Sequence, residues 1–123
     1  MLDLILIQEK IFVFSSKATS ISSGATWTLP LPVNADSATI RYKFNSEDGD
    51  MIFAMYYVTE KKKMIIVPQR LFDFAQDETS GQFDVRGPGT LFLRWANTHT
   101  WYGEKILSYS VEINEVSDLS CSR

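Results

Sequence analysis

Residues 106–114 read Ile-Leu-Ser-Tyr-Ser-Val-Glu-Ile-Asn, and they show the clearest alternation of apolar and polar side chains in the chain. Neighbouring side chains of a β-strand point to opposite faces, so a period of two marks a strand with one dry and one wet face. We therefore expect a strand whose inward side chains are Leu107, Tyr109, Val111 and Ile113, and whose outward side chains are Ser108, Ser110, Glu112 and Asn114.

The same period recurs along the chain. Residues 90–95 place Leu91, Leu93 and Trp95 on one face and Phe92 and Arg94 on the other. Further strands are predicted at residues 2–7, 11–14, 25–29, 39–44, 51–58, 64–67 and 82–85, and polar or glycine-rich turns separate them. About eight short strands at this spacing, without a sustained helical stripe, predict an all-β protein built as a two-sheet antiparallel β-sandwich.

Several boundaries follow from individual residues. Pro30 and Pro32 are expected to stop the 25–29 strand at a sheet edge, because proline cannot donate to a ladder, and Pro68 is expected to close the 64–67 strand. Residues 17–24 read as a loop or an edge strand, and residues 70–75 as a strand or a single helical turn. Residues 51–58 are apolar on both faces, which predicts a central strand covered on both sides.

The length of 123 residues fits one domain, predicted over residues 1–116 with a flexible tail over 117–123. The net charge of −3 argues against nucleic acid as a partner, since nucleic-acid binders usually carry a basic footprint. The single cysteine, Cys121, fits a reducing compartment. Residues 2–7 are too short for a signal-peptide core or a membrane span.

Catalytic chemistry finds little support in the sequence. His99 is the only histidine, and no glycine-framed serine accompanies it. The acidic turn 47–50 is interpreted as a hairpin turn in preference to a calcium-binding loop, and residues 87–89 lack the lysine of a phosphate loop. We therefore expect no enzyme activity, no metal and no cofactor.

The candidate interaction surface combines two loops. Trp101 and Tyr102 follow a polar loop and either form a binding site or cover the open end of the core, with His99 beside them. Asn97 is expected to stabilise the loop backbone. The only basic run, Lys61, Lys62 and Lys63, reads foremost as a solvated turn and otherwise as a phosphate or lipid-headgroup patch.

The carboxyl half carries a more specific pattern. Gly89 is followed by Leu91-x-Leu93-x-Trp95-Ala96-Asn97-Thr98-His99-Thr100-Trp101, then Lys105 and the alternating strand that ends at Ile113. This pattern, together with residues 40–44 and 50–53, resembles the GOLD domains of membrane-trafficking proteins over roughly residues 11–114. Ala96 departs from the acidic residue common there, and the cysteine pair of the luminal branch is missing.

The resemblance implies a jelly-roll-like sandwich of the cytosolic branch, which follows lipid-binding or coiled-coil regions. It implies a non-catalytic module for protein–protein contacts in vesicle traffic, Golgi or endosome organisation, or lipid transfer. Its expected partner is a trafficking or adaptor protein, and its expected location is cytoplasmic, peripheral to Golgi or endosomal membranes. The alternatives are a carbohydrate-binding sandwich using Trp27, Trp101 and Tyr102, and a weak lipid-binding role for the three lysines.

Overall fold

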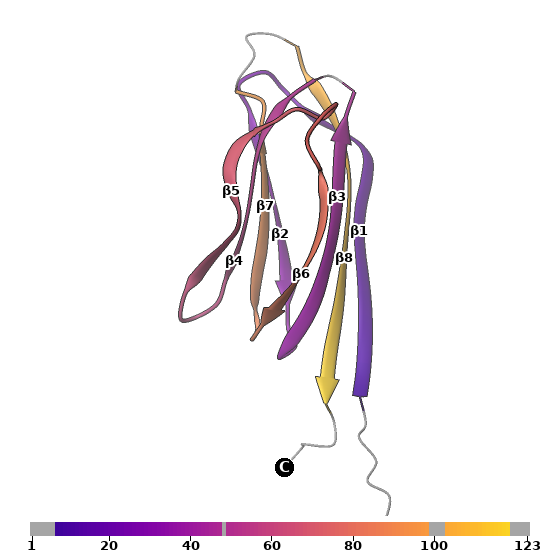
Figure 1. Ribbon diagram of the computed structural model, residues 1–123, viewed down its shortest axis with the longest axis vertical. Helices are drawn as coiled ribbons and strands as arrows, with labels where there is room; N and C mark the ends of the chain where they lie inside the picture. The colour runs from indigo at the N-terminus through magenta and orange to yellow at the C-terminus, as the bar shows by residue number, and fades with distance from the viewer. Residues whose placement is uncertain (1–6, 48, 99–102, 119–123) are drawn as a thin grey trace, which may run out of the picture.

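The computed structural model describes residues 7–47, 49–98 and 103–118, which form eight strands in two antiparallel sheets of four. The two sheets pack face to face (Figure 1). The all-β sandwich expected from the sequence is therefore confirmed. The strands are β1 (Ile7–Ile21), β2 (Thr26–Val33), β3 (Ser37–Ser46), β4 (Met51–Val58), β5 (Lys63–Phe72), β6 (Ser80–Arg86), β7 (Gly89–Ala96) and β8 (Lys105–Asp118).

The strand order is that of a jelly roll. One sheet has the order β1-β8-β3-β6 and the other β2-β7-β4-β5. The first strand pairs with the last, the second with the second last, and so on inward: β1–β8, β2–β7, β3–β6 and β4–β5. In addition, β3 pairs with β8 in one sheet and β4 with β7 in the other. Two interlocked Greek keys of this kind define the jelly-roll sandwich.

Alternating side chains from both sheets fill the core. The inward positions predicted on β7 and β8 are confirmed: Leu91, Leu93 and Trp95 are fully buried, as are Leu107, Val111 and Ile113. Aromatic rings dominate the centre, where Phe44 and Phe53 lie 4.2 Å apart between ring centroids. Such pairs add directional contacts to the burial of apolar area.

The predicted end of the second strand is wrong. β2 continues through both Pro30 and Pro32 to Val33 and pairs with β7 along its whole length. The prolines are tolerated because β2 is an edge strand, as the sequence indicated, and alternate N–H groups of an edge strand face solvent. The same holds for Pro68, which lies inside β5, the other edge of this sheet.

The prediction for residues 51–58 is correct in part. β4 is a central strand between β7 and β5. Its inward side chains are buried, but Ile52, Tyr56 and Val58 on the outer face are only half-buried. The described residues form just two layers, so no element covers this outer face.

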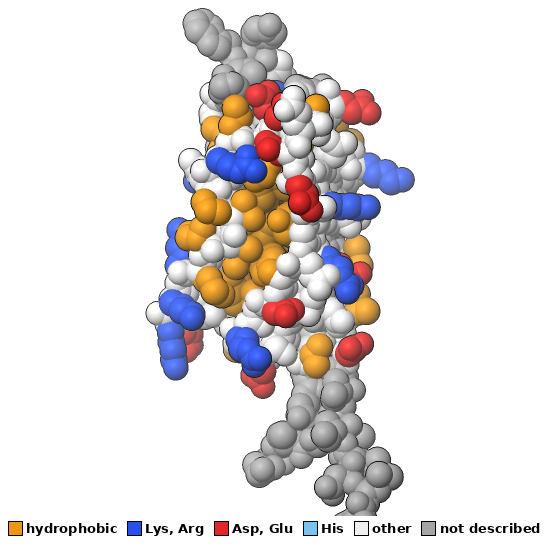
Figure 2. Space-filling model, in the orientation of Figure 1, with side chains coloured by type: hydrophobic (Ala, Val, Ile, Leu, Met, Phe, Trp, Pro, Cys, Tyr) orange, Lys and Arg blue, Asp and Glu red, His pale blue; other side chains and the backbone are white. Residues whose placement is uncertain are grey.

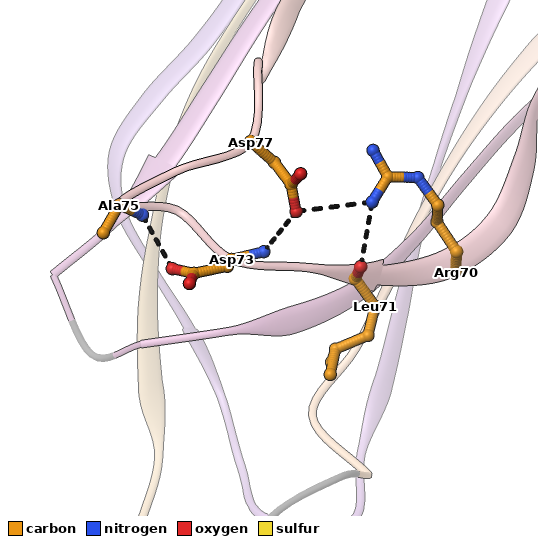
Figure 3. A network of polar contacts seen from close by, with 5 residues as sticks. All are labelled: Arg70, Leu71, Asp73, Ala75 and Asp77. Carbon is orange, nitrogen blue, oxygen red and sulfur yellow. Dashed lines mark hydrogen bonds and ion pairs between the residues drawn. The ribbon is translucent and has the colours of Figure 1, made fainter.

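Residues 70–77 contain the end of a strand and then a turn, as Figure 3 shows. β5 ends at Phe72, and Asp77 Oδ2 accepts bonds from the backbone N–H of Asp73 at 2.8 Å and from Arg70 Nη1 at 3.3 Å. The Asp73 N–H, and then Arg70, hold the pKa of Asp77 below its ordinary value. This exposed network fixes the β5–β6 connection.

The first and last strands are longer than predicted. β1 runs from Ile7 to Ile21 with a bulge between Ser16 and Thr19, so most of residues 17–24 belong to an edge strand, one of the two structures expected for them. β8 continues to Asp118, which pairs with Ile7, so strand pairing extends into the predicted tail. The predicted segment 2–7 lies outside the described residues except for Ile7.

Candidate interaction surface

The outer face of the β2-β7-β4-β5 sheet carries a row of apolar side chains across all four strands. Pro30 pairs with Phe92, Phe92 with Tyr56, and Tyr56 with Ile65. Directly paired residues point to the same side of a sheet, so the four side chains are neighbours. Ile65 remains 54% exposed, and Tyr56 and Phe92 are half-buried.

Two rings form the middle of this row. The centroids of Tyr56 and Phe92 are 5.0 Å apart, with 18° between the ring planes. The stacking fixes both rings against each other, and both side chains remain half-buried. A rigid aromatic pair buries area on binding at low cost in side-chain entropy.

Cations adjoin the rings at one end of the sheet. Lys63 pairs with Val58, and its Nζ lies 4.3 Å from the centroid of the Tyr56 ring. Lys61 and Lys62 are exposed in the β4–β5 turn, which is closed by a bond from the Thr59 N–H to the Lys62 carbonyl oxygen at 2.9 Å. Lys61 and Lys62 thus lie in an exposed turn between two strands, as expected, whereas Lys63 begins the next strand.

A shallow hollow lies beside these lysines. It lies between the β4–β5 and β6–β7 turns and has a volume of ≈ 590 Å³. Lys61, Lys62 and Arg86 line it, with Glu60 as its one acidic side chain. The Tyr57 hydroxyl donates to the Gly87 carbonyl oxygen at 2.6 Å and so ties the β6–β7 turn to β4.

The charge of this sheet is one-sided. Its four strands contain no Asp or Glu, whereas Lys63 and Arg94 lie on them, and Arg70 of β5 is paired with Asp77 in the β5–β6 connection. Basic side chains are visible at the lower left of Figure 2, where Figure 1 has the β4–β5 turn. A protein with a net charge of −3 thus presents one cationic, partly apolar face. We call this the basic–aromatic face: Pro30, Tyr56, Lys61, Lys62, Lys63, Ile65 and Phe92.

Apolar side chains also gather beside this face. Figure 2 shows them in the opening between the two sheets, at the side formed by the edge strands β5 and β6. Half-buried Met64 and Ile66 of β5 and Phe83 of β6 pack against the core there. β5 therefore carries apolar side chains toward both the outer face and the opening.

Asn97 is wrongly predicted as part of a surface, but its expected structural role is confirmed. It is 1% exposed, and its Nδ2 donates to the carbonyl oxygens of Ile21 and Gly103, each at 3.0 Å. Its backbone exchanges bonds with Gly24 and Ala25. Asn97 therefore holds the β1–β2 and β7–β8 connections together.

The other predicted aromatic candidates divide into two groups. His99, Trp101 and Tyr102 lie outside the described residues, as does Cys121. Trp27 is half-buried and stacks on the buried Trp95 with 5.5 Å between ring centroids. Trp27 is thus part of the packing and not a free platform.

Several residues of the face and interior were missed in the sequence. Tyr56 was assigned to a strand covered on both sides. The predicted outward position of Phe92 already indicated that one sheet carries an aromatic side chain on its outer face. Two buried charges were missed as well: Lys105 Nζ donates to the Asp50 carbonyl oxygen, and Glu115 Oε2 accepts from the Asn34 N–H at 2.9 Å. Both bind backbone of neighbouring turns, so their roles are structural.

The part of the chain that the structure describes holds no group of three or more His, Cys, Asp or Glu side chains arranged to bind a metal ion. Nor does it hold a helix of the length and apolarity that crossing a bilayer requires.

The geometry defines the class of this protein as a jelly-roll β-sandwich. No family model and no curated protein matches the sequence. Solved structures share the fold: tripeptidyl peptidase 2 is similar with a TM-score of 0.57 and 16% identity, over 82% of this chain and 10% of that one. The VP2 subviral particle of infectious bursal disease virus is similar with a TM-score of 0.57 and 12% identity, over 88% of this chain and 33% of that one.

A further structure of the same virus, from the Gx strain, has a TM-score of 0.54 at 10% identity, with 88% and 33% coverage. The chain therefore spans a tenth of the peptidase and a third of the viral protein. At these identities the similarity shows the fold alone. None of the three is described as a GOLD domain, so kinship with that family stays a proposal.

Proposed function

We propose that this domain is a non-catalytic protein–protein interaction module whose basic–aromatic face binds an acidic, apolar segment of a partner protein. One observation carries the proposal: a row of apolar side chains with a stacked ring pair at its centre lies on the outer face of a sheet whose four strands carry no carboxylate. Lys63 adjoins the rings, and Lys61 and Lys62 lie with Glu60 in the neighbouring turn. Aromatic side chains are enriched at the centres of interfaces, and complementary charge steers the encounter.

The arrangement of the face favours a protein segment over a bilayer. Tyr56 and Phe92 are half-buried and stack on each other in the middle of a sheet, so they do not project as an inserting loop tip would. The lysines lie at one end of the row. A segment lying across the face therefore meets the rings with apolar side chains and the lysines with acidic ones.

The set of side chains suits binding and supplies no evident chemistry. Apolar, aromatic and cationic groups make up the face, and a reaction at neutral pH usually needs a base placed beside a nucleophile. The proposed module therefore acts by presenting a surface.

The proposed setting rests on the resemblance to GOLD domains. It comprises vesicle traffic, Golgi or endosome organisation, or lipid transfer, on the cytoplasmic side and peripheral to the membrane. The residues that carry the resemblance have structural roles here: Asn97 and Lys105 bind neighbouring backbone, and Trp95 fills the core. These roles support the proposal, because they give a physical reason for the shared residues.

The test uses a synthetic extended peptide in which Asp or Glu alternates with Leu or Phe, titrated against the protein by calorimetry. Truncating the Tyr56 ring in Tyr56→Ser is expected to remove about 1–2 kcal/mol of binding free energy, a loss of roughly 5- to 30-fold in affinity. Lys61→Glu with Lys62→Glu is expected to slow association and weaken its salt dependence. Lys43→Glu on the other sheet is the matched control and should bind normally.

Parallel titrations with other ligands separate the alternatives. Vesicles of phosphatidylcholine with phosphatidylserine test a membrane role, and soluble oligosaccharides test a carbohydrate role. The proposal is wrong if vesicles or a sugar bind saturably while the peptide does not, or if Tyr56→Ser and Lys43→Glu bind the peptide equally well.

A further inference from the structure

The four sheet edges of the sandwich are protected to different degrees. β2 carries Pro30 and Pro32, and β5 carries Pro68 together with two register irregularities along its pairing with β4. β6 is the shortest strand, with 7 residues, and exposes Asp84 and Arg86. Prolines, bulges, short length and charges are the usual devices that stop an edge from adding another strand.

β1 has a bulge between Ser16 and Thr19 and charges at Glu9, Lys10 and Lys17, but the stretch 11–16 between them has none of these devices. β1 is the longest strand, with 15 residues, and residues 11–16 read Ile-Phe-Val-Phe-Ser-Ser, without a charge or a proline. Ile11, Phe12 and Val13 are 58%, 42% and 60% exposed. Among the strands that the structure describes, only β8 pairs with β1, so the backbone N–H and C=O groups of alternate residues along its other side are available to another strand.

We propose that β1 pairs antiparallel with β1 of a second copy of this chain, joining two four-stranded sheets into one continuous sheet across a two-fold axis. A two-fold dimer is the commonest closed assembly, and it needs a strand that is complementary to itself. β1 meets this requirement, because Ile11 and Val13 lie on the same face, one residue before and one residue after Phe12. An antiparallel pair of β1 strands centred on Phe12 therefore sets Ile11 of each copy opposite Val13 of the other. The proposal is independent of the basic–aromatic face, which lies on the other sheet.

The register follows from the alternation of side chains. Apart from Ile11 and Val13, the outer face of the β1 sheet is mostly polar, and Arg41 donates there to Gln82 on one side and to Glu112 on the other. A two-fold axis at a residue of β1 keeps this polar face on the same side in both copies, since paired residues then have the same parity. An axis between two residues would instead place the polar face of one copy beside the core side of the other.

The axis is placed at Phe12. With this axis, Ile11 of each copy lies opposite Val13 of the other, and the two Phe12 residues lie opposite each other. Glu9 then faces Ser15, and Lys10 faces Phe14, so no like charges oppose each other. An axis at Ile11 would pair Glu9 with Val13, and an axis at Lys10 would set two lysines face to face, which destabilises a pair. An axis at Val13 would carry the pairing from Glu9 to Lys17, which lies in the bulge between Ser16 and Thr19 where regular pairing is interrupted.

The dimer is expected to be weak. A contact made by one strand from each copy is smaller than the roughly 1,600 Å² of a standard stable interface. We expect a dissociation constant on the order of 10–100 μM. In sedimentation-velocity experiments the average mass should rise with concentration from the 14.0 kDa of one chain toward twice that value.

Charge substitution with rescue is the first test. Ile11→Lys with Val13→Lys, and separately Ile11→Glu with Val13→Glu, should each be monomeric at concentrations where the original chain dimerises, because like charges then oppose each other. An equimolar mixture of the two variants should dimerise again. Thr28→Lys, on the edge strand β2, is the matched control and should dimerise normally.

Disulfide trapping is the second test and does not depend on the stability of the charge variants. In a Cys121→Ser background, Phe12→Cys should form an interchain disulfide under glutathione buffer, because residues at the axis have Cα atoms about 4.5–5.5 Å apart. Faster trapping by Ile11→Cys or Val13→Cys would overturn the register. A chain that stays monomeric well above 100 μM, or a mixture that fails to dimerise, would overturn the pairing itself.

Discussion

Asn97→Ala tests how the open end of the sandwich is held. The Asn97 side chain donates two bonds of 3.0 Å, one to the Ile21 carbonyl oxygen at the end of β1 and one to the Gly103 carbonyl oxygen before β8. The substitution removes both donors and leaves the backbone bonds of residue 97 to Gly24 and Ala25 in place. Its effect therefore reports on the side chain alone.

The magnitude follows from the burial of this site. Asn97 is 1% exposed, so water cannot readily replace the lost donors. Leaving a buried acceptor unpaired costs about 1–3 kcal/mol, and the Gly103 carbonyl is nearer to solvent, so we expect a total loss of about 2–4 kcal/mol. At an unfolding entropy of about 2.1 cal/mol/K per residue, each kcal/mol lowers the melting temperature by about 4 °C, giving a decrease of roughly 8–16 °C.

Differential scanning calorimetry measures this decrease directly. Asn45→Ala, at an exposed position of β3, is the matched control and should stay within about 2 °C of the unsubstituted chain. Asn97→Asp replaces donors by acceptors that face two carbonyl oxygens, so it should be at least as destabilising as alanine. The reasoning is refuted if Asn97→Ala melts as the control does.

Three further predictions concern packing, pH and a surface ion pair. In Gly89→Ala the new methyl group would approach Tyr57 Cζ to 2.8 Å, and overpacking of this kind should cost about 1–3 kcal/mol by denaturant titration; a neutral substitution would contradict the close approach. Burial raises the pKa of Tyr42 and Tyr57, so the unfolded chain loses these protons first. Stability should be unaffected by them below pH ~10 and fall as pH rises from there toward the folded pKa values, and a flat profile between about pH 10 and 11.5 would count against their burial. Arg41→Ala breaks a 2.8 Å ion pair with the partly exposed Glu112 and should cost less than about 1 kcal/mol at low salt, whereas a larger loss would mean that the pair is more shielded from water than the structure has it.

The sequence predicts the strands that face one wet and one dry side. β3, β7 and β8 were found because their side chains alternate, and the core positions Ile40, Leu93 and Val111 follow from that period. Alternation is a local property, so it survives without knowledge of any partner strand.

Strand ends and surfaces depend on partners and were harder to predict. Pro30 ends a strand in the interior of a sheet but not at its edge, and the edge position is known only from the topology. Likewise, Tyr56 and Phe92 are 36 residues apart in the chain and meet only through the β4–β7 register. Lys105 was noted as part of a motif, but its burial against Asp50 required the structure.

The most direct test of the proposed function is a map of backbone amide chemical shifts in isotope-labelled protein, recorded while the acidic, apolar peptide is added. We predict that the largest changes occur at Tyr56, Phe92 and Ile65 and at the lysines of the β4–β5 turn, with β1 and β8 unchanged. Changes centred on the other sheet, or no changes at saturating peptide, would contradict the assignment of the basic–aromatic face as the binding surface.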